Sequence, residues 1–116
     1  MITIQRIYEP VGSGTVRLLV DRLWPRGLSK TAAMLDGWYK EVAPTTELRR
    51  WFGHDAARFA EFGRRYLEEL DHRSSVVAEL LALAHRGDIV LLSAAHDPIH
   101  NHAVVLAQYL QGHMSD

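Results

Sequence analysis

Two short polar segments of this 116-residue chain gather the side chains best suited to chemistry. Residues 21–27 read Asp-Arg-Leu-Trp-Pro-Arg-Gly, and residues 93–102 read Ser-Ala-Ala-His-Asp-Pro-Ile-His-Asn-His. Arginine presents a planar, permanently charged fork that matches carboxylate and phosphate groups. Histidine exchanges protons near neutral pH and, when neutral, binds divalent metals. The two segments therefore indicate anion recognition, proton transfer or metal binding.

In the first segment, the two-residue alternation of an extended chain places Arg22, Trp24 and Arg26 on one side. Pro25 keeps Trp24 extended, and Gly27 gives the backbone freedom to leave the segment. Two guanidinium groups beside an aromatic ring favour an anionic ligand with a flat or phosphorylated part. The alternative is that Trp24 lies in the core and that the arginines form surface ion pairs.

The second segment holds three histidines within seven residues. We expect His102 or His96 to act in catalysis, by contacting the ligand or moving a proton. The other residues of this segment expected to bind the ligand are Ser93, Asp97, His100 and Asn101. His96, His100 and His102 are also candidate metal ligands, although their spacing matches no standard zinc pattern. The alternative is that Asn101 caps a helix and the histidines bond loop carbonyls.

A third motif, Trp-Phe-Gly-His-Asp at 51–55, adds one further candidate, His54. The residues around His54 have ordinary structural roles: the aromatic residues suit a core, Gly53 suits a helix end and Asp55 suits a helix start. We expect His54 to point into the same cleft and to contact the ligand there.

Hydrophobic periodicity indicates which elements position these segments. Continuous apolar runs predict strands near residues 2–7, 15–23 and 88–94. Apolar residues at helical spacing predict helices near residues 35–42, 46–52, 56–73, 76–86 and 102–111. The expected fold is a single α/β domain over residues 1–116. It has a small, mainly parallel sheet with helices on both faces, in a three-layer, Rossmann-like arrangement.

Composition argues against several classes of function. The chain has no cysteine, so it forms no disulfide and offers no thiolate to a metal or a substrate. Its 13 basic and 14 acidic residues leave a net charge of −1, which argues against nucleic acid as a partner. No apolar stretch reaches the length of a membrane span, and the N-terminal residues lack the apolar region of a signal peptide. We therefore expect a cytoplasmic protein without a membrane partner; the sequence identifies no cofactor.

The motifs at 21–27 and 51–55, together with His-Asn-His-Ala at 100–103, resemble the bacterial domain-of-unknown-function family 488 in its short, YeaO-like branch. The resemblance spans nearly the whole chain and implies a small cytoplasmic α/β domain, with no settled activity. Longer members carry a cysteine at the end of the corresponding strand and Cys-His-Arg in the loop. Here Ser93 takes the first position and residues 101–103 read Asn-His-Ala, which removes the thiolate nucleophile. The start of the last helix still attracts anions without one.

Three functions are compatible with these residues. In the first, a small anionic ligand, with or without a phosphate, is held by Arg22, Arg26 and the amides that begin the last helix. The second is a metal-binding protein or metal-dependent enzyme that uses the three histidines. The third is a regulatory or interaction domain without chemistry. The first function requires residues 21–27 and 93–102 to meet at the carboxyl ends of the strands, where ligands of open α/β sheets bind.

Overall fold

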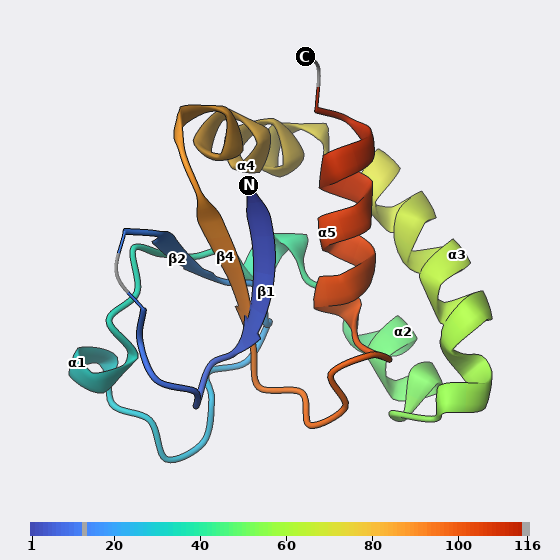
Figure 1. Ribbon diagram of the computed structural model, residues 1–116. Helices are drawn as coiled ribbons and strands as arrows, with labels where there is room; N and C mark the ends of the chain where they lie inside the picture. Colours follow the sequence, from blue (N-terminus) through green and yellow to red (C-terminus); the bar gives the residue numbers. More distant parts are fainter. Residues whose placement is uncertain (13, 115–116) are drawn as a thin grey trace.

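A four-stranded sheet in which every neighbouring pair of strands is parallel forms the centre of the computed structural model (Figure 1). The structure describes residues 1–12 and 14–114. The strands are β1 (Ile2–Arg6), β2 (Val16–Leu19), β3 (Gly37–Trp38) and β4 (Ile89–Ser93), in the order β1-β4-β2-β3. The helices are α1 (Lys30–Ala33), α2 (Thr46–Phe52), α3 (Phe59–Asp71), α4 (Ser74–Arg86) and α5 (His102–Gly112), with 3-10 turns η1 (Lys40–Val42) and η2 (Ala56–Arg58). The predicted α/β class with a parallel sheet is confirmed.

The strand β4 lies between β1 and β2 and is buried along its whole length. Its alternate residues enter two different cores, since successive side chains of a strand point to opposite faces. Ile89 and Leu91 pack with α2 to α5, whereas Val90 and Leu92 pack against part of the segment 24–35, which includes α1. Figure 1 shows α1 on one side of the sheet and α3 and α5 on the other. Both faces are covered as predicted, but one of them carries a single short helix.

Residues 35–42 do not form the predicted helix. They form β3 and η1 instead, with β3 hydrogen-bonded beside β2. Just before β3, the Arg17 amide donates to Asp36 Oδ2 at 2.7 Å, and the Asp36 amide donates to the Arg17 carbonyl at 2.8 Å. Periodicity cannot separate helix from strand in so short an apolar run, and pairing with β2 decided the outcome.

Several helix ends follow the predicted local signals. Thr45 caps α2 by accepting a hydrogen bond from the Leu48 amide at 3.2 Å, and Gly53 ends this helix with a φ of 54°. Asp55 accepts from the Ala57 amide at 3.0 Å and so starts η2, which leads into α3. None of the helices in the described residues has both the length and the apolar character needed to cross a membrane.

The turn after η1 is held by side chains from distant parts of the chain. Tyr66 Oη donates to the buried Val42 carbonyl at 2.6 Å. Arg22 donates to the next two carbonyls at 3.0 and 3.3 Å, and Arg73 donates to the first of these. Buried carbonyls outside helices and strands need such donors, so these bonds fix the turn beside the carboxyl end of β2.

We expect Tyr66→Phe to lower the free energy of unfolding by about 1–3 kcal/mol, because the buried Val42 carbonyl would lose its donor. Urea denaturation followed by circular dichroism measures this change. Tyr109→Phe is the control, because its hydroxyl donates to Asp71 at an exposed position and its loss should cost less than about 0.5 kcal/mol. Equal losses in the two variants would contradict the role assigned to Tyr66.

Candidate functional site

A cavity of about 860 Å³ opens at the carboxyl ends of β2 and β4. Its walls come from residues 21–26, from parts of 93–102, and from the ends of β1 and α2. In Figure 1 the loops that follow β2 and β4 both run along the lower edge of the molecule. The volume is typical of pockets that enclose small molecules. The two polar segments therefore share one cavity.

Most of the residues predicted for the site line this cavity. They are Arg22, Trp24, Arg26, His54, Ser93, His96, Asp97, Asn101 and His102. His100 is not among the residues that line it. Its ring lies edge-on to Phe59, with centroids 5.2 Å apart, and its Nδ1 lies 2.8 Å from Asp97 Oδ2. The geometry therefore gives His100 a place in the loop but no contact with the cavity.

Cationic side chains outnumber carboxylates in the cavity wall. Its arginines are Arg6, Arg22, Arg26 and Arg49, and its acidic residues are Asp21 and Asp97. The chain as a whole has a net charge of −1, so the cavity is more positive than the protein around it. Clefts lined by one sign of charge concentrate ligands of the opposite sign.

The four arginines are not equivalent. Arg22 donates to backbone carbonyls of the 43–44 turn and so has a structural task. Arg6 Nη2 lies 3.1 Å from His96 Nδ1, which joins the end of β1 to the loop after β4. Arg26 and Arg49 are exposed, and no hydrogen bond or ion pair joins either guanidinium group to residues 1–12 or 14–114. These two are therefore available to an anion.

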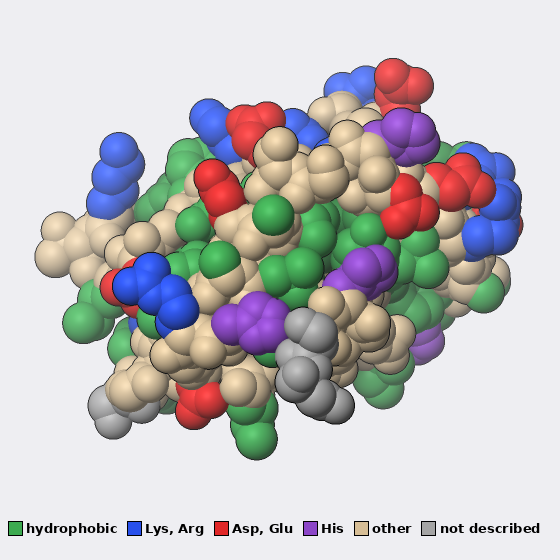
Figure 2. Space-filling model, turned by 90° about the horizontal axis from the view of Figure 1, so that it is seen from above, with side chains coloured by type: hydrophobic (Ala, Val, Ile, Leu, Met, Phe, Trp, Pro, Cys, Tyr) green, Lys and Arg blue, Asp and Glu red, His purple; other side chains and the backbone are tan. Residues whose placement is uncertain are grey.

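The arginines on the outer surface of α3 are neutralised by neighbouring carboxylates. Figure 2 shows basic and acidic side chains lying side by side at the right-hand edge, over α3. Arg64 pairs with Glu61 and Glu68 at 2.6 and 2.8 Å, and Arg65 pairs with Glu61 at 2.8 Å. Hydrogen bonds from Arg64 and Arg65 lower the pKa of Glu61 to about 2. The helix surface and the cavity thus differ in how their arginines are used.

Asp21 is the buried acid at the inner end of the cavity. Its Oδ2 accepts from the Ala94 amide at 2.8 Å, and its Oδ1 lies 2.9 Å from His102 Nε2. The same ring nitrogen lies 3.1 Å from the Val20 carbonyl and is better aligned with it, so Oδ1 has no aligned hydrogen bond within the described residues. Burial raises the pKa of Asp21, but His102, the Ala94 amide and the Ser93 hydroxyl together outweigh burial and lower the pKa.

Asp97 organises the loop between β4 and α5. Its Oδ1 accepts from the amides of Ile99 and His100 at 2.9 and 3.0 Å. The side-chain amide of Asn101 donates to the Asp97 carbonyl, and its oxygen caps α5 by accepting from the Val104 amide at 3.1 Å. The alternative in which Asn101 caps the last helix is therefore the observed one. Hydrogen bonds to the Asp97 carboxylate lower the pKa of Asp97 to about 2, and the bond from the His100 amide has the largest effect.

The three histidines of the second segment do not converge. His96 lies against Arg6, and His100 binds Asp97. His102 contacts the end of β2. Within residues 1–12 and 14–114, no three side chains of His, Asp or Glu gather as metal ligands would. The predicted metal alternative therefore has no support in the positions of the histidines.

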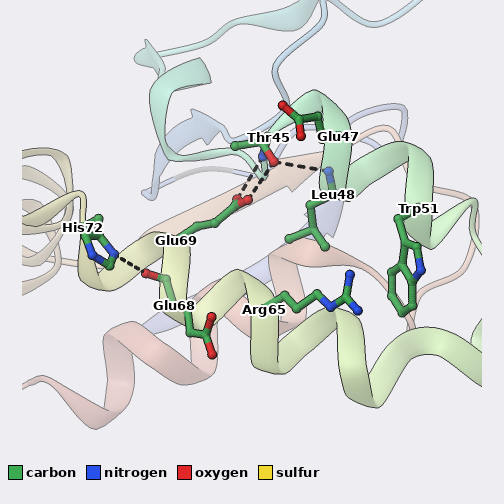
Figure 3. A pocket seen from close by; sticks show the side chains of 8 residues that line it. All are labelled: Thr45, Glu47, Leu48, Trp51, Arg65, Glu68, Glu69 and His72. Atoms are coloured by element: carbon green, nitrogen blue, oxygen red, sulfur yellow. Dashed lines mark hydrogen bonds between the residues drawn. The ribbon is translucent and has the colours of Figure 1, made fainter.

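A second hollow, between α2 and α3, has a volume of about 590 Å³ (Figure 3). Its walls carry Glu47, Glu68 and Glu69, and the polar groups mostly satisfy one another. Glu69 accepts from the amide and the hydroxyl of Thr45 at 2.9 and 2.6 Å. Arg65 lies over the Trp51 ring, 4.3 Å from its centroid. This hollow is less suited to a ligand than the cavity at the strand ends.

Sequence reasoning missed three charged residues of the cavity: Arg6, Asp21 and Arg49. Arg6 is the last residue of β1 and is in register with Ser93, so its position at a strand end was a usable signal. Asp21 follows β2 directly, in the motif already singled out. Nothing in the spacing of α2 indicates that Arg49 faces this cavity.

These features define a class of protein. It is a parallel α/β domain that has a positively charged cavity at its strand ends and no cysteine. The whole chain, residues 1–116, matches the family described as the inactive DUF488-N3 subclade, and the protein belongs to this family. The resemblance predicted from the three motifs is confirmed.

The relatives are uncharacterised bacterial proteins. The uncharacterised protein Rv3073c of Mycobacterium tuberculosis (strain H37Rv) is 42% identical over 112 residues, which cover 96% of this chain and 94% of the relative. The uncharacterised protein YeaO of Escherichia coli (strain K12) is 41% identical over 111 residues, which cover 95% of this chain and 96% of the relative. No solved structure matches the chain.

The lowered pKa of Asp97 predicts a stability that depends on pH. A carboxyl whose pKa is lower in the folded than in the unfolded chain stabilises the fold above its unfolded pKa, roughly 4. This contribution disappears as the pH falls toward the folded pKa of about 2. We expect Asp97→Asn to be less stable than the wild type near neutral pH, and the difference to shrink below about pH 4.

Urea denaturation at a series of pH values measures the difference in the free energy of unfolding. Glu79→Gln, at an exposed position on α4, is the control. A difference between Asp97→Asn and the wild type that stays constant with pH would contradict the assignment.

Proposed function

We propose that the protein binds a small organic anion with a flat or apolar part in the cavity at the carboxyl ends of β2 and β4. The observation that carries the proposal is the cluster of arginines from separate segments around one cavity of about 860 Å³. Arginine forms short, charge-assisted hydrogen bonds with carboxylates and phosphates, often through two nitrogens at once.

The charged group of the ligand is assigned to Arg26 and Arg49. Both are exposed, and the described part of the chain offers their guanidinium groups no carboxylate or carbonyl partner. Arg22 lines the same wall but is bound to the 43–44 turn, so its role is to support the site. His54 and His96 lie on the same cavity and are assigned hydrogen-bond contacts with the ligand.

The apolar part of the ligand is assigned to the wall formed by Leu23, Trp24, Pro25 and Phe52. Trp24 is held in place, because its Nε1 donates to the Leu28 carbonyl at 2.6 Å and its ring meets Trp38 edge-on at 5.3 Å. A fixed aromatic wall favours a planar group at little cost in side-chain order. An inorganic anion would leave this wall uncovered.

The proposal is binding without covalent catalysis. The chain has no cysteine, and it belongs to a subclade described as inactive. Ser93 is buried, and its Oγ accepts from the Ala95 amide at 3.1 Å. An activated serine needs a general base within hydrogen-bond reach, and none of the hydrogen bonds of Ser93 in the described residues joins it to a histidine. Proton transfer by His96 or His102 is not part of the proposal.

A thermal-shift screen followed by calorimetry tests the proposal. The probes are aromatic carboxylates, phenyl phosphate, nucleoside monophosphates and inorganic phosphate. We expect an aromatic anion to stabilise the wild type more than inorganic phosphate does. The double variant Arg26→Ala, Arg49→Ala should bind that anion about tenfold more weakly or worse, because it loses charge-assisted hydrogen bonds.

The matched control is the double variant Arg50→Ala, Arg86→Ala. It removes the same formal charge from exposed positions that do not line the cavity. We expect this control to bind like the wild type. If no probe stabilises the wild type more than the Arg26→Ala, Arg49→Ala variant, the proposed function is wrong.

A further inference from the structure

We infer that the end of β4 and the start of α5 form a binding position for a small carboxylate, and that the Asp21 side chain occupies it as an internal ligand. This inference does not depend on the function proposed above. It concerns the inner end of the cavity, whereas the proposed ligand meets the exposed arginines at its outer rim.

The donors around Asp21 converge from two elements that are distant from it in the sequence. The Ala94 amide, directly after β4, donates to Oδ2 at 2.8 Å, and the nearby Ser93 hydroxyl contributes to lowering the pKa of the same carboxylate. His102, the first residue of α5, brings Nε2 to within 2.9 Å of Oδ1. An amide that donates to one carboxylate oxygen, and an imidazole within ion-pair distance of the other, are the kind of groups that hold an anion.

The surroundings favour a negative charge at this position. The side chains of Asp21 and His102 are only 15% and 16% exposed, so the interaction is largely shielded from solvent. The helix α5 is 11 residues long and begins beside the carboxylate, so the positive end of its dipole adds to the attraction. Consistent with this, the pKa of Asp21 is lowered although burial alone raises it.

The internal ligand has a consequence for what else can bind. His102, which the sequence indicates as a ligand contact, already lies against the Asp21 carboxylate, and the amide that follows Ser93 donates to it. An anion from solution therefore does not reach the strand–loop–helix position unless Asp21 leaves it. Asp21 is thus the residue that excludes external anions from the inner end of the cavity.

Chemical rescue tests the inference. Asp21→Ala removes the carboxylate and leaves its donors around a small void. We expect the melting temperature to fall by several degrees, and we expect added formate to recover most of this loss in a saturable manner. Acetate, which is larger, should recover less. Chloride at the same ionic strength is the reference, so that salt effects cancel.

Two variants show whether the response belongs to this position. Asp21→Asn fills the same volume without a charge, so formate should not stabilise it. Asp97→Ala removes a carboxylate that also accepts two backbone hydrogen bonds, in the same loop but with a side chain that is 39% exposed, so it should leave no enclosed site. A formate response of Asp21→Ala no larger than that of these variants or of the wild type would overturn the inference.

Destabilisation of Asp21→Ala is itself informative. If this variant does not fold in chloride, the readout becomes the yield of folded protein on refolding in formate. Recovery in formate but not in chloride supports the inference, and no recovery in either overturns it. The binding of aromatic anions through Arg26 and Arg49 is measured separately, so the failure of one proposal is distinguishable from the failure of the other.

Discussion

Hydrogen bonding along both edges of β4 places the polar groups of the cavity. The two ladders continue past the ends of the strands, where the Ile7 amide donates to the Ser93 carbonyl at 2.8 Å and the Val20 amide donates to the Leu92 carbonyl at 3.0 Å. The strands β1 and β2 therefore leave the sheet level with β4. Because all strands are parallel, their exits lie at one edge, where ligands of open α/β sheets bind. The cavity is a consequence of this register.

Many polar residues at that edge are used by the fold itself. Chain segments near this edge lie outside helices and strands, and their backbone groups need hydrogen bonds. Arg22 holds the 43–44 turn, Asn101 caps α5 and Asp97 orders the loop before it. A polar motif at a strand end is thus largely a requirement of the architecture. Arg26 and Arg49 differ, because their guanidinium groups have no such partners among residues 1–12 and 14–114.

Membership of a subclade described as inactive agrees with this division of tasks. The position where longer relatives are expected to carry a cysteine holds Ser93, whose hydroxyl bonds within the protein. The groups after β4 and at the start of α5 are occupied by Asp21, whose carboxylate accepts from the Ala94 amide and lies against His102. In the function proposed above, the ligand therefore meets the exposed guanidinium groups and not the end of the cavity that Asp21 occupies.

The sequence by itself determined the α/β class, the buried strand β4 and the helix ends at Thr45, Gly53 and Asn101. These features depend on hydrophobic pattern and on neighbours a few residues away, which a sequence displays directly. Only the tertiary structure decided that residues 35–42 pair with β2 rather than forming a helix, and that the three histidines of the second segment turn to separate partners. It also decided that Arg22 serves a turn, because the use of a charged side chain is determined by the groups that packing brings within hydrogen-bond distance, and those groups lie far away in the chain.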